Sequence, residues 1–150
     1  MYNDDPPKLW AFEALKHLPF LQDLEQDKEW IILHNIYHAM SRRLIPAGGY
    51  LFKYGEEINH LRLIQDGVVE LYVRTFLILT NLQIEIDGKE VIIERLMRGS
   101  ILNYRTFFME EPALVFARAN KNVTVLEITF PGMSQFFKDS DVFERKLLAH

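Results

Sequence analysis

The spacing of apolar side chains divides the chain into three parts. Residues 8–43 repeat apolar side chains at intervals of three and four, which predicts helices. Residues 44–128 consist of short apolar runs separated by turn residues, which predicts strands. Residues 131–150 return to the helical spacing. This helix–sheet–helix order predicts a single domain of the α+β class over residues 1–150.

Helices are expected at both ends of the chain. Pro19 interrupts the first helix, because proline lacks the backbone N–H that a helix interior needs. A second helix is expected to start within residues 23–26 and to end at residues 41–43. Residues 141–150 predict a last helix with a capping box at its start. We expect this helix to be cut short, because no Gly or Pro follows it.

Glycines mark the expected turns between strands. Gly48, Gly55 and Gly67 fall between apolar runs, where the backbone must reverse. Asp87 and Gly88 separate two further runs. An Asp-Gly pair favours a type I′ hairpin turn, because both central residues of that turn adopt positive φ. Together these positions predict closely spaced antiparallel strands.

The composition limits the possible partners. A net charge of −4 argues against nucleic acid or an anionic membrane surface. With no cysteine, the chain has no disulfide, thiol nucleophile or Cys-based zinc site. No apolar run approaches the roughly 20 residues of a membrane span, and residues 1–7 lack a signal peptide's apolar core. We therefore expect a cytoplasmic chain without direct membrane insertion, alone or as the cytosolic part of a membrane protein.

Several segments together resemble the cyclic-nucleotide-binding domain family. Residues 46–48 begin the first loop, and residues 55–56 are Gly-Glu where the family has Gly-Asp or Gly-Glu. Residues 63–67 resemble its apolar pair and loop glycine, and residues 15–24 resemble the segment that leads into these domains. The resemblance covers residues 12–148. It implies a jelly-roll-like antiparallel β-roll of about eight strands, flanked by N-terminal and C-terminal helices.

The family binds its ligand in a phosphate cassette, with the pattern G-x-x-F-G-E-x-A followed by R-x-A-x-V. The resemblance implies that backbone amides and the Arg hold the cyclic phosphate, while the Glu binds the ribose 2′-hydroxyl. The candidate cassette lies within residues 99–119. Its candidate ligand-binding residues are Gly99, Ser100, Leu102, Asn103, Tyr104, Arg105, Thr106, Ala113, Leu114 and Val115. In this register Asn103 replaces the second Gly, Tyr104 the Glu and Ala113 the Arg.

Three residues leave alternatives open. Arg118 is the other candidate for the cassette Arg, but that register leaves too few residues before Ile128, so we prefer Ala113. Arg105 is either a substitute cation near the pocket mouth or a solvated surface residue. Tyr104 either contacts a ligand or fills the vacant pocket, and we expect it to fill the pocket, because an empty apolar site is destabilising.

The resemblance implies a cAMP or cGMP sensor-like regulatory domain of a larger protein. The lead-in segment 15–24 suggests a cation channel as that protein, an analogy at the level of the fold. Without the Arg and the Glu, cyclic nucleotide binding is expected to weaken by at least about two orders of magnitude. The alternative is a non-binding homologue with a self-filled pocket, which acts as a structural or protein-interaction module. Its partners are then the other domains of its parent protein, and nucleic acid is not expected.

Other residue groups carry little chemistry. His34 and His38 have the spacing of metal ligands on a helix, but no third ligand accompanies them. The Glu pairs at 56–57 and 110–111 are interpreted as solvated loop charge, and Ser100 has no evident His partner. We therefore expect no enzyme activity, no metal and no cofactor.

The chain is longer between Gly67 and Gly99 than the family usually requires. The extra residues 74–82 include a run of apolar side chains. We expect this insertion to pack on the roll, because a large exposed apolar segment is unusual. The alternative is that it docks a partner within a larger protein.

Overall fold

The strands form two four-stranded antiparallel sheets, in a computed structural model that describes residues 9–18, 26–79 and 84–137. One sheet has the order β1-β8-β3-β6 and the other β2-β7-β4-β5. The strands are β1 Ser41–Ile45, β2 Tyr50–Phe52, β3 His60–Asp66, β4 Val69–Leu79, β5 Ile84–Leu96, β6 Ile101–Leu102, β7 Phe116–Ala119 and β8 Val123–Thr129. The predicted antiparallel β-roll with flanking helices is confirmed.

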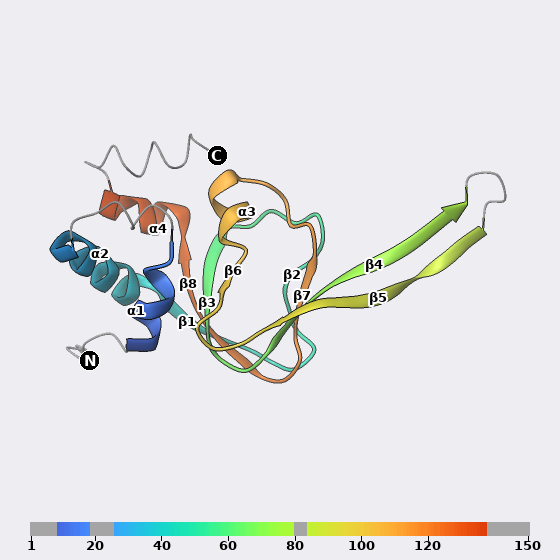
Figure 1. Cartoon of the computed structure of the whole chain (residues 1–150), viewed down its shortest axis with the longest axis horizontal. Helices are drawn as coiled ribbons and strands as arrows, with labels where there is room; N and C mark the ends of the chain where they lie inside the picture. The colour runs from blue at the N-terminus through green and yellow to red at the C-terminus, as the bar shows by residue number, and fades with distance from the viewer. Residues whose placement is uncertain (1–8, 19–25, 80–83, 138–150) are drawn as a thin grey trace.

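Helices lie at one end of the roll and beside it (Figure 1). They are α1 Leu9–Leu15, α2 Gln26–Ala39, α3 Tyr104–Met109 and α4 Phe130–Ser134, the last continued by a 3₁₀ turn at Gln135–Phe137. In Figure 1, α1, α2 and α4 gather beside the sheet that contains β1, β3 and β8, while α3 stands apart from them. None of the helices in the described ranges has the length and apolar character that a membrane crossing needs.

The hydrophobic core joins the roll to the helices. Strand β3 supplies Leu61, Leu63 and Ile64, and all three are completely buried. Helices α1 and α2 add Leu15 and Ile36 to the same cluster of buried residues. Burial of each such side chain contributes about 1.5–3 kcal/mol relative to exposure, so the helices are integral to the domain.

The predicted turn glycines have the required backbone conformation. Gly48, Gly55 and Gly67 have φ values of 83°, 86° and 92°. Gly48 lies between β1 and β2, Gly55 follows β2, and Gly67 joins β3 to β4. Each glycine therefore marks a chain reversal of the roll.

The predicted end of the second helix is wrong. Residues 41–43 belong to β1, which pairs along its whole length with β8, from Ser41 opposite Glu127 to Ile45 opposite Val123. The helix ends at Ala39. The backbone groups of β1 gain partners on β8, and this non-local pairing outweighs the local helical pattern.

The predicted turn at Asp87 and Gly88 is also wrong. Both residues lie inside β5, which pairs with β4 on either side of them. The register shifts opposite this point, between Thr75 and Leu77, so Asp87 and Gly88 occupy a bulge rather than a turn. The connection between the strands includes residues 80–83, outside the described residues.

The insertion does not lie on the roll as expected. Figure 1 shows β4 and β5 leaving the sheets together as a two-stranded ribbon that extends away from the rest of the domain. At the outer end of the described ladder, Leu79 lies opposite Ile84. Residues 80–82 of the insertion and the predicted last helix at 141–150 lie outside the described residues.

Candidate ligand-binding site

Helix α3 is the central element of the candidate cassette. Asn103 precedes it with φ 46° and ψ 37°, a left-handed conformation that asparagine tolerates better than most residues. The Asn103 carbonyl accepts hydrogen bonds from the Phe107 amide at 3.0 Å and from the Thr106 hydroxyl at 2.9 Å. Asn103 thus adopts a conformation that suits the family's second Gly, while it adds an amide side chain there.

The cassette cavity is a hollow of about 190 Å³ between α3 and the roll. Its lining residues are Phe52, Leu71, Asn103, Arg105, Thr106, Ala113, Leu114 and Val115. The structure therefore brings together the candidate residues Asn103, Arg105, Thr106, Ala113, Leu114 and Val115. The wall is largely apolar, and Arg105, at an exposed position, is the one ionisable residue that lines it within the described part of the chain.

Backbone hydrogen bonds hold Ala113 in the cavity wall. The Gly55 amide donates to the Ala113 carbonyl, and the Ala113 amide donates to the Glu56 carbonyl, both at 2.8 Å. These two bonds tie the turn after β2 to the segment before β7. The Ala113 side chain is 2% exposed, so the position at which the resemblance puts a phosphate-binding Arg is filled by a buried methyl group.

Four candidate residues lie outside this cavity. Gly99 and Tyr104 line a separate hollow of about 210 Å³ against α1, and Tyr104 is 42% exposed. Tyr104 therefore does not fill the cassette cavity, and that expectation is wrong. Leu102 is fully buried in the core, and Ser100 accepts a backbone hydrogen bond from Ile64 at 3.0 Å.

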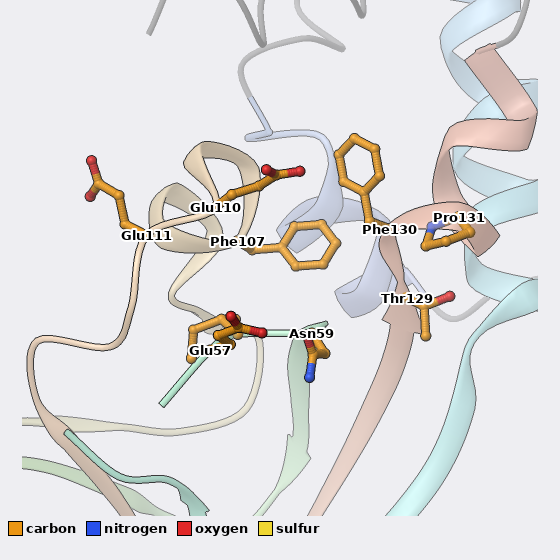
Figure 2. Close-up of a pocket in the computed structure, with 9 residues that line it drawn as sticks. Glu57, Asn59, Phe107, Glu110, Glu111, Thr129, Phe130 and Pro131 are labelled. Carbon is orange, nitrogen blue, oxygen red and sulfur yellow. The ribbon is translucent and has the colours of Figure 1, made fainter. Parts of the chain in front are cut away.

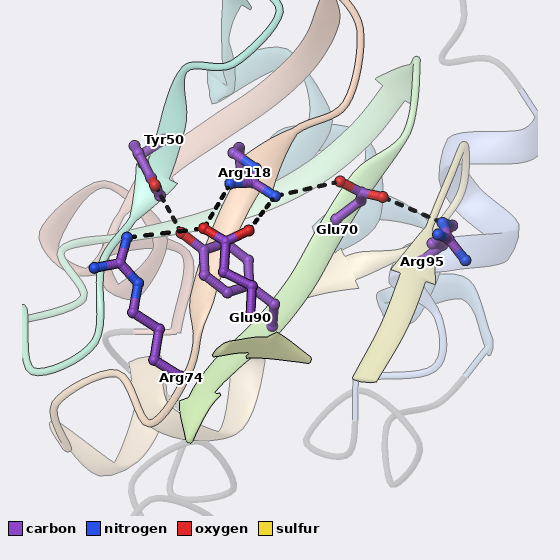
Figure 3. A network of polar contacts seen from close by, with 7 residues as sticks. Tyr50, Glu70, Arg74, Glu90, Arg95 and Arg118 are labelled. Carbon is purple, nitrogen blue, oxygen red and sulfur yellow. Dashed lines mark hydrogen bonds and ion pairs between the residues drawn. The ribbon is translucent and has the colours of Figure 1, made fainter. Parts of the chain in front are cut away.

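Arg118 lies on the opposite face of β7 from the core. Ala117 and Ala119 are buried in the core cluster, and strand alternation turns Arg118 the other way. Its guanidinium donates to both carboxylate oxygens of Glu90, at 3.2 and 3.0 Å, and lies 3.8 Å from Glu70 (Figure 3). Arg118 is thus held by carboxylates on β4 and β5, away from the cassette cavity.

Two tyrosines complete this outer network. The Tyr50 and Tyr72 hydroxyls are 2.6 Å apart, and the Arg118 guanidinium lies 4.5 Å from the Tyr72 ring centre. The hydrogen bond with Tyr72 is the main cause that lowers the pKa of Tyr50, and burial is the main cause that raises the pKa of Tyr72. The network links side chains from all four strands of this sheet, β2, β7, β4 and β5.

Glu90 is expected to make the stability of this sheet depend on acid pH. The hydrogen bond from Arg118 is the main cause that holds the pKa of Glu90 below its ordinary value. A depressed folded-state pKa stabilises the fold above the unfolded-state value, and this contribution is lost as pH falls through the folded value. The free energy of unfolding of Glu90→Gln should therefore fall less than that of the wild type between about pH 5 and about pH 2.

The control for this measurement is Glu94→Gln, which removes an exposed carboxylate from the same strand. Urea unfolding at a series of pH values measures all three proteins. A Glu90→Gln profile parallel to the wild-type profile would show that the Arg118–Glu90 contact does not couple protonation to folding.

A larger cavity of about 510 Å³ is lined by residues of α3, the start of α4 and the loop before β3 (Figure 2). Its lining residues are Glu57, Ile58, Asn59, Phe107, Glu110, Glu111, Thr129, Phe130 and Pro131. The pairing of Glu57 with Pro112 brings the two loops with acidic pairs together. Spacing along the chain did not reveal this cavity, because its carboxylates come from segments more than fifty residues apart.

The two histidines with metal-ligand spacing lie on α2. The His34 and His38 rings lie 4.4 Å apart on α2. Among the residues that the structure describes, no group of three or more His, Asp or Glu side chains could hold a metal ion.

The two sheets and their flanking helices define a β-roll domain, with the cassette cavity between α3 and the roll. The family model for the cyclic nucleotide-binding domain matches residues 42–140. The match spans more than half of the chain, which therefore belongs to the cyclic nucleotide-binding domain family. Membership of a ligand-binding family agrees with the expectation of a non-enzymatic regulatory domain.

Solved structures share this fold at low sequence identity. A cyclic nucleotide-binding-like protein from Brucella abortus bv. 1 str. 9-941 has a TM-score of 0.67 and 17% identity, over 85% of this chain and 97% of its own. The N-terminal domain of a transcriptional regulator from Streptomyces coelicolor A3(2) has a TM-score of 0.66 and 17% identity, over 91% and 85%.

A third structure is the regulatory subunit of a cAMP-independent protein kinase A from Trypanosoma cruzi, bound to guanosine. Its TM-score is 0.59 at 20% identity, over 91% of this chain and 43% of its own. At these identities the likeness shows the fold alone. No curated protein sequence matches the chain significantly.

Proposed function

We propose that the chain is the regulatory ligand-binding domain of a larger protein, with atypical and weak binding of cAMP or cGMP. The observation that carries this proposal is Ala113. It is a buried residue of the cassette cavity wall, at the position to which the resemblance assigns the phosphate-binding Arg. The chain thus has the fold of a cyclic nucleotide-binding domain, with Ala113 in place of the Arg that would bind the phosphate.

The energetic consequence is large enough to measure. A hydrogen bond to a charged group contributes about 1.5–3 kcal/mol, which is roughly a 10- to 150-fold change in the dissociation constant. Tyr104, at the position of the ribose-binding Glu, lines a different hollow, so the second family contact is also missing. Among the described residues that line the cavity, Arg105 is the candidate substitute for the missing cation, and it lies at an exposed position.

For the parent protein we propose a cation channel with this domain in the cytoplasm. The support is the resemblance of segment 15–24 to the segment that leads into these domains. Its first residue, Leu15, ends α1 and is buried in the core. In such a protein the other domains are the partners of this one, and ligand binding acts by shifting the population of conformations.

The alternative function is a structural or protein-interaction module that binds no cyclic nucleotide. The size of the cassette cavity favours it. About 190 Å³ is below the roughly 300–1,000 Å³ of pockets that enclose drug-sized ligands. A ligand titration separates the two functions.

Replacing Ala113 with arginine is expected to tighten cAMP and cGMP binding by roughly 10- to 150-fold, because it supplies the missing charge at the cavity wall. Isothermal titration calorimetry on wild type and Ala113→Arg measures the change. Thermal unfolding with millimolar nucleotide checks it, since ligand at 100 times its dissociation constant stabilises the fold by about 2.7 kcal/mol.

Leu114→Arg is the control for position, because it adds the same charge to the same cavity from an exposed residue instead of from the buried wall. Arg105→Ala tests the substitute cation and should weaken any residual wild-type binding. Equal affinities of Ala113→Arg, Leu114→Arg and wild type would argue against Ala113 as the phosphate position.

A further inference from the structure

We propose that the outer face of the sheet β2-β7-β4-β5 docks an acidic segment of a partner protein. The surface that carries this inference, the basic–aromatic face, consists of Tyr50, Lys53, Tyr54, Arg74, Phe116 and Arg118. It lies on the other side of the strands whose inner side faces the cassette cavity. The inference therefore does not depend on the binding of a cyclic nucleotide.

The two sides of strand β4 carry different chemistry. Leu71 lines the cassette cavity, and the next residue, Tyr72, faces the opposite way by strand alternation. On that outer side the Tyr72 and Phe116 rings stack with their centres 4.9 Å apart. Tyr72 is completely buried, so the half-buried Phe116 and the cations beside it form the surface. In Figure 1, helices α1, α2 and α4 gather beside the other sheet rather than on this face.

The cations of this face lie on aromatic rings. The guanidinium carbon of Arg74 lies 5.0 Å from the centre of the Phe116 ring. The Lys53 Nζ lies 5.0 Å from the centre of the Tyr50 ring. An aromatic ring attracts a cation through its quadrupole but carries no net charge. Each cation is therefore held in place while its positive charge remains available to an anion.

Carboxylates do not neutralise these cations fully. Among the described residues, Lys53 has no ion pair, and Arg74 reaches only one carboxylate, with Glu90 Oε1 at 3.8 Å. The Glu90 carboxylate already accepts two shorter hydrogen bonds from Arg118 (Figure 3). Within the described part of the chain, four cations of this face and its network share two carboxylates. The face is thus positive in a chain whose net charge is −4.

Exposed aromatic rings define the rest of the partner's chemistry. Tyr54 is 61% exposed, and its ring centre lies 6.4 Å from that of Phe116. These two rings offer an apolar contact surface beside the cations, and tyrosine and arginine are enriched among residues that dominate binding energy. The face therefore fits a segment whose carboxylates pair with Lys53 and Arg74 while an aromatic side chain packs on the rings.

The carboxylates of the network favour a peptide over nucleic acid. In Figure 3, Arg74 and Arg118 reach Glu90 from different sides, and the Glu90 side chain is 38% exposed. A nucleic acid strand would bring closely spaced phosphates near this carboxylate, whereas a peptide places its acidic groups one by one. The net charge of −4 also opposes binding to a phosphate backbone.

Fluorescence anisotropy on the full chain tests the inference. The probes are a fluorescein-labelled repeat of Asp-Glu-Phe, uncharged Asn-Gln-Phe and non-aromatic Asp-Glu-Ser repeats of equal length, and a labelled oligothymidine. We expect the Asp-Glu-Phe peptide to bind most tightly, and its affinity to fall as salt rises. Lys53→Gln combined with Arg74→Gln should weaken this binding at least about fivefold, because each lost exposed ion pair accounts for up to about fivefold.

Arg43→Gln is the matched control. Arg43 is also a partly exposed strand arginine with one long carboxylate contact, 3.6 Å to Glu127, but it lies on β1 of the other sheet. Its replacement removes the same charge from the chain and should leave the peptide affinity unchanged. Tyr54→Ala tests the aromatic part of the face and should weaken binding of the Asp-Glu-Phe peptide but not of the Asp-Glu-Ser peptide.

Four results would overturn the inference. The first is no binding of the Asp-Glu-Phe peptide by a chain that is folded by circular dichroism. The second is equal affinity of the wild type and the Lys53 and Arg74 double variant. Tighter binding of oligothymidine would assign the face to nucleic acid instead. An equal loss of affinity in Arg43→Gln would show that total charge, and not this face, attracts the peptide.

Discussion

Glu127→Ala is expected to lower the free energy of unfolding by about 3–5 kcal/mol, because it leaves a buried arginine without its counter-charge. The Arg62 Nε lies 2.7 Å from Glu127 Oε2, and the two side chains are 8% and 9% exposed. The residues face each other across the β3–β8 ladder. Urea unfolding with linear extrapolation measures the loss.

Arg62→Met should lower the free energy of unfolding by less than Glu127→Ala does. Glu127 then keeps the partly exposed Arg43, whose Nη1 lies 3.6 Å away, whereas Arg62 has no second carboxylate among its described ion pairs. The combined replacement Arg62→Met with Glu127→Leu should recover most of the stability, because apolar pairs of similar volume replace buried ion pairs at little cost.

The pair formed by Lys16 and Glu13 is the matched control for burial. Its nitrogen–oxygen distance is also 2.7 Å, but the side chains are 43% and 56% exposed. Glu13→Ala should change the free energy of unfolding by about 0–1 kcal/mol. Losses of similar size in Glu13→Ala and Glu127→Ala would show that burial does not determine the strength of the pair.

The buried ion pair also shows where prediction from the sequence ends. The apolar runs and glycines predict the roll, because alternation and chain reversal are local properties. The contact between Arg62 and Glu127 depends on the register of two strands that are 65 residues apart. Sequence spacing did not predict it, and for the same reason it predicted a helix end instead of β1 at residues 41–43.

In the candidate site, too, the sequence pattern predicted some features, while others depend on contacts between distant segments. The cassette pattern selected the residues around Asn103 and Ala113, and these line one cavity. The pattern did not predict the direction of Tyr104, since that depends on the packing of α1 against the cassette. The partners of Arg118 depend on β5, whose bulge at Asp87 and Gly88 was predicted as a turn.

Gly67→Ala is expected to lower the free energy of unfolding by about 2–5 kcal/mol. The φ of 92° places Gly67 in the left-handed region, where a side chain costs about 1–2 kcal/mol. A Cβ would also lie 2.5 Å from the Asn122 carbonyl oxygen and 3.0 Å from Val123 Cα. Both are backbone atoms, so relief requires moving the start of β8, and such overpacking adds roughly 1–3 kcal/mol.

Gly55→Ala separates the two costs of the Gly67 substitution. Gly55 has a similar φ of 86°, but a Cβ there would meet nothing within 4 Å. This variant should therefore lose only the conformational part, about 1–2 kcal/mol, in the same urea experiment. Equal losses at the two positions would mean that β8 yields to the added methyl group without cost. A larger loss at Gly67 would show that this glycine is required by the close approach of β8 as well as by the turn.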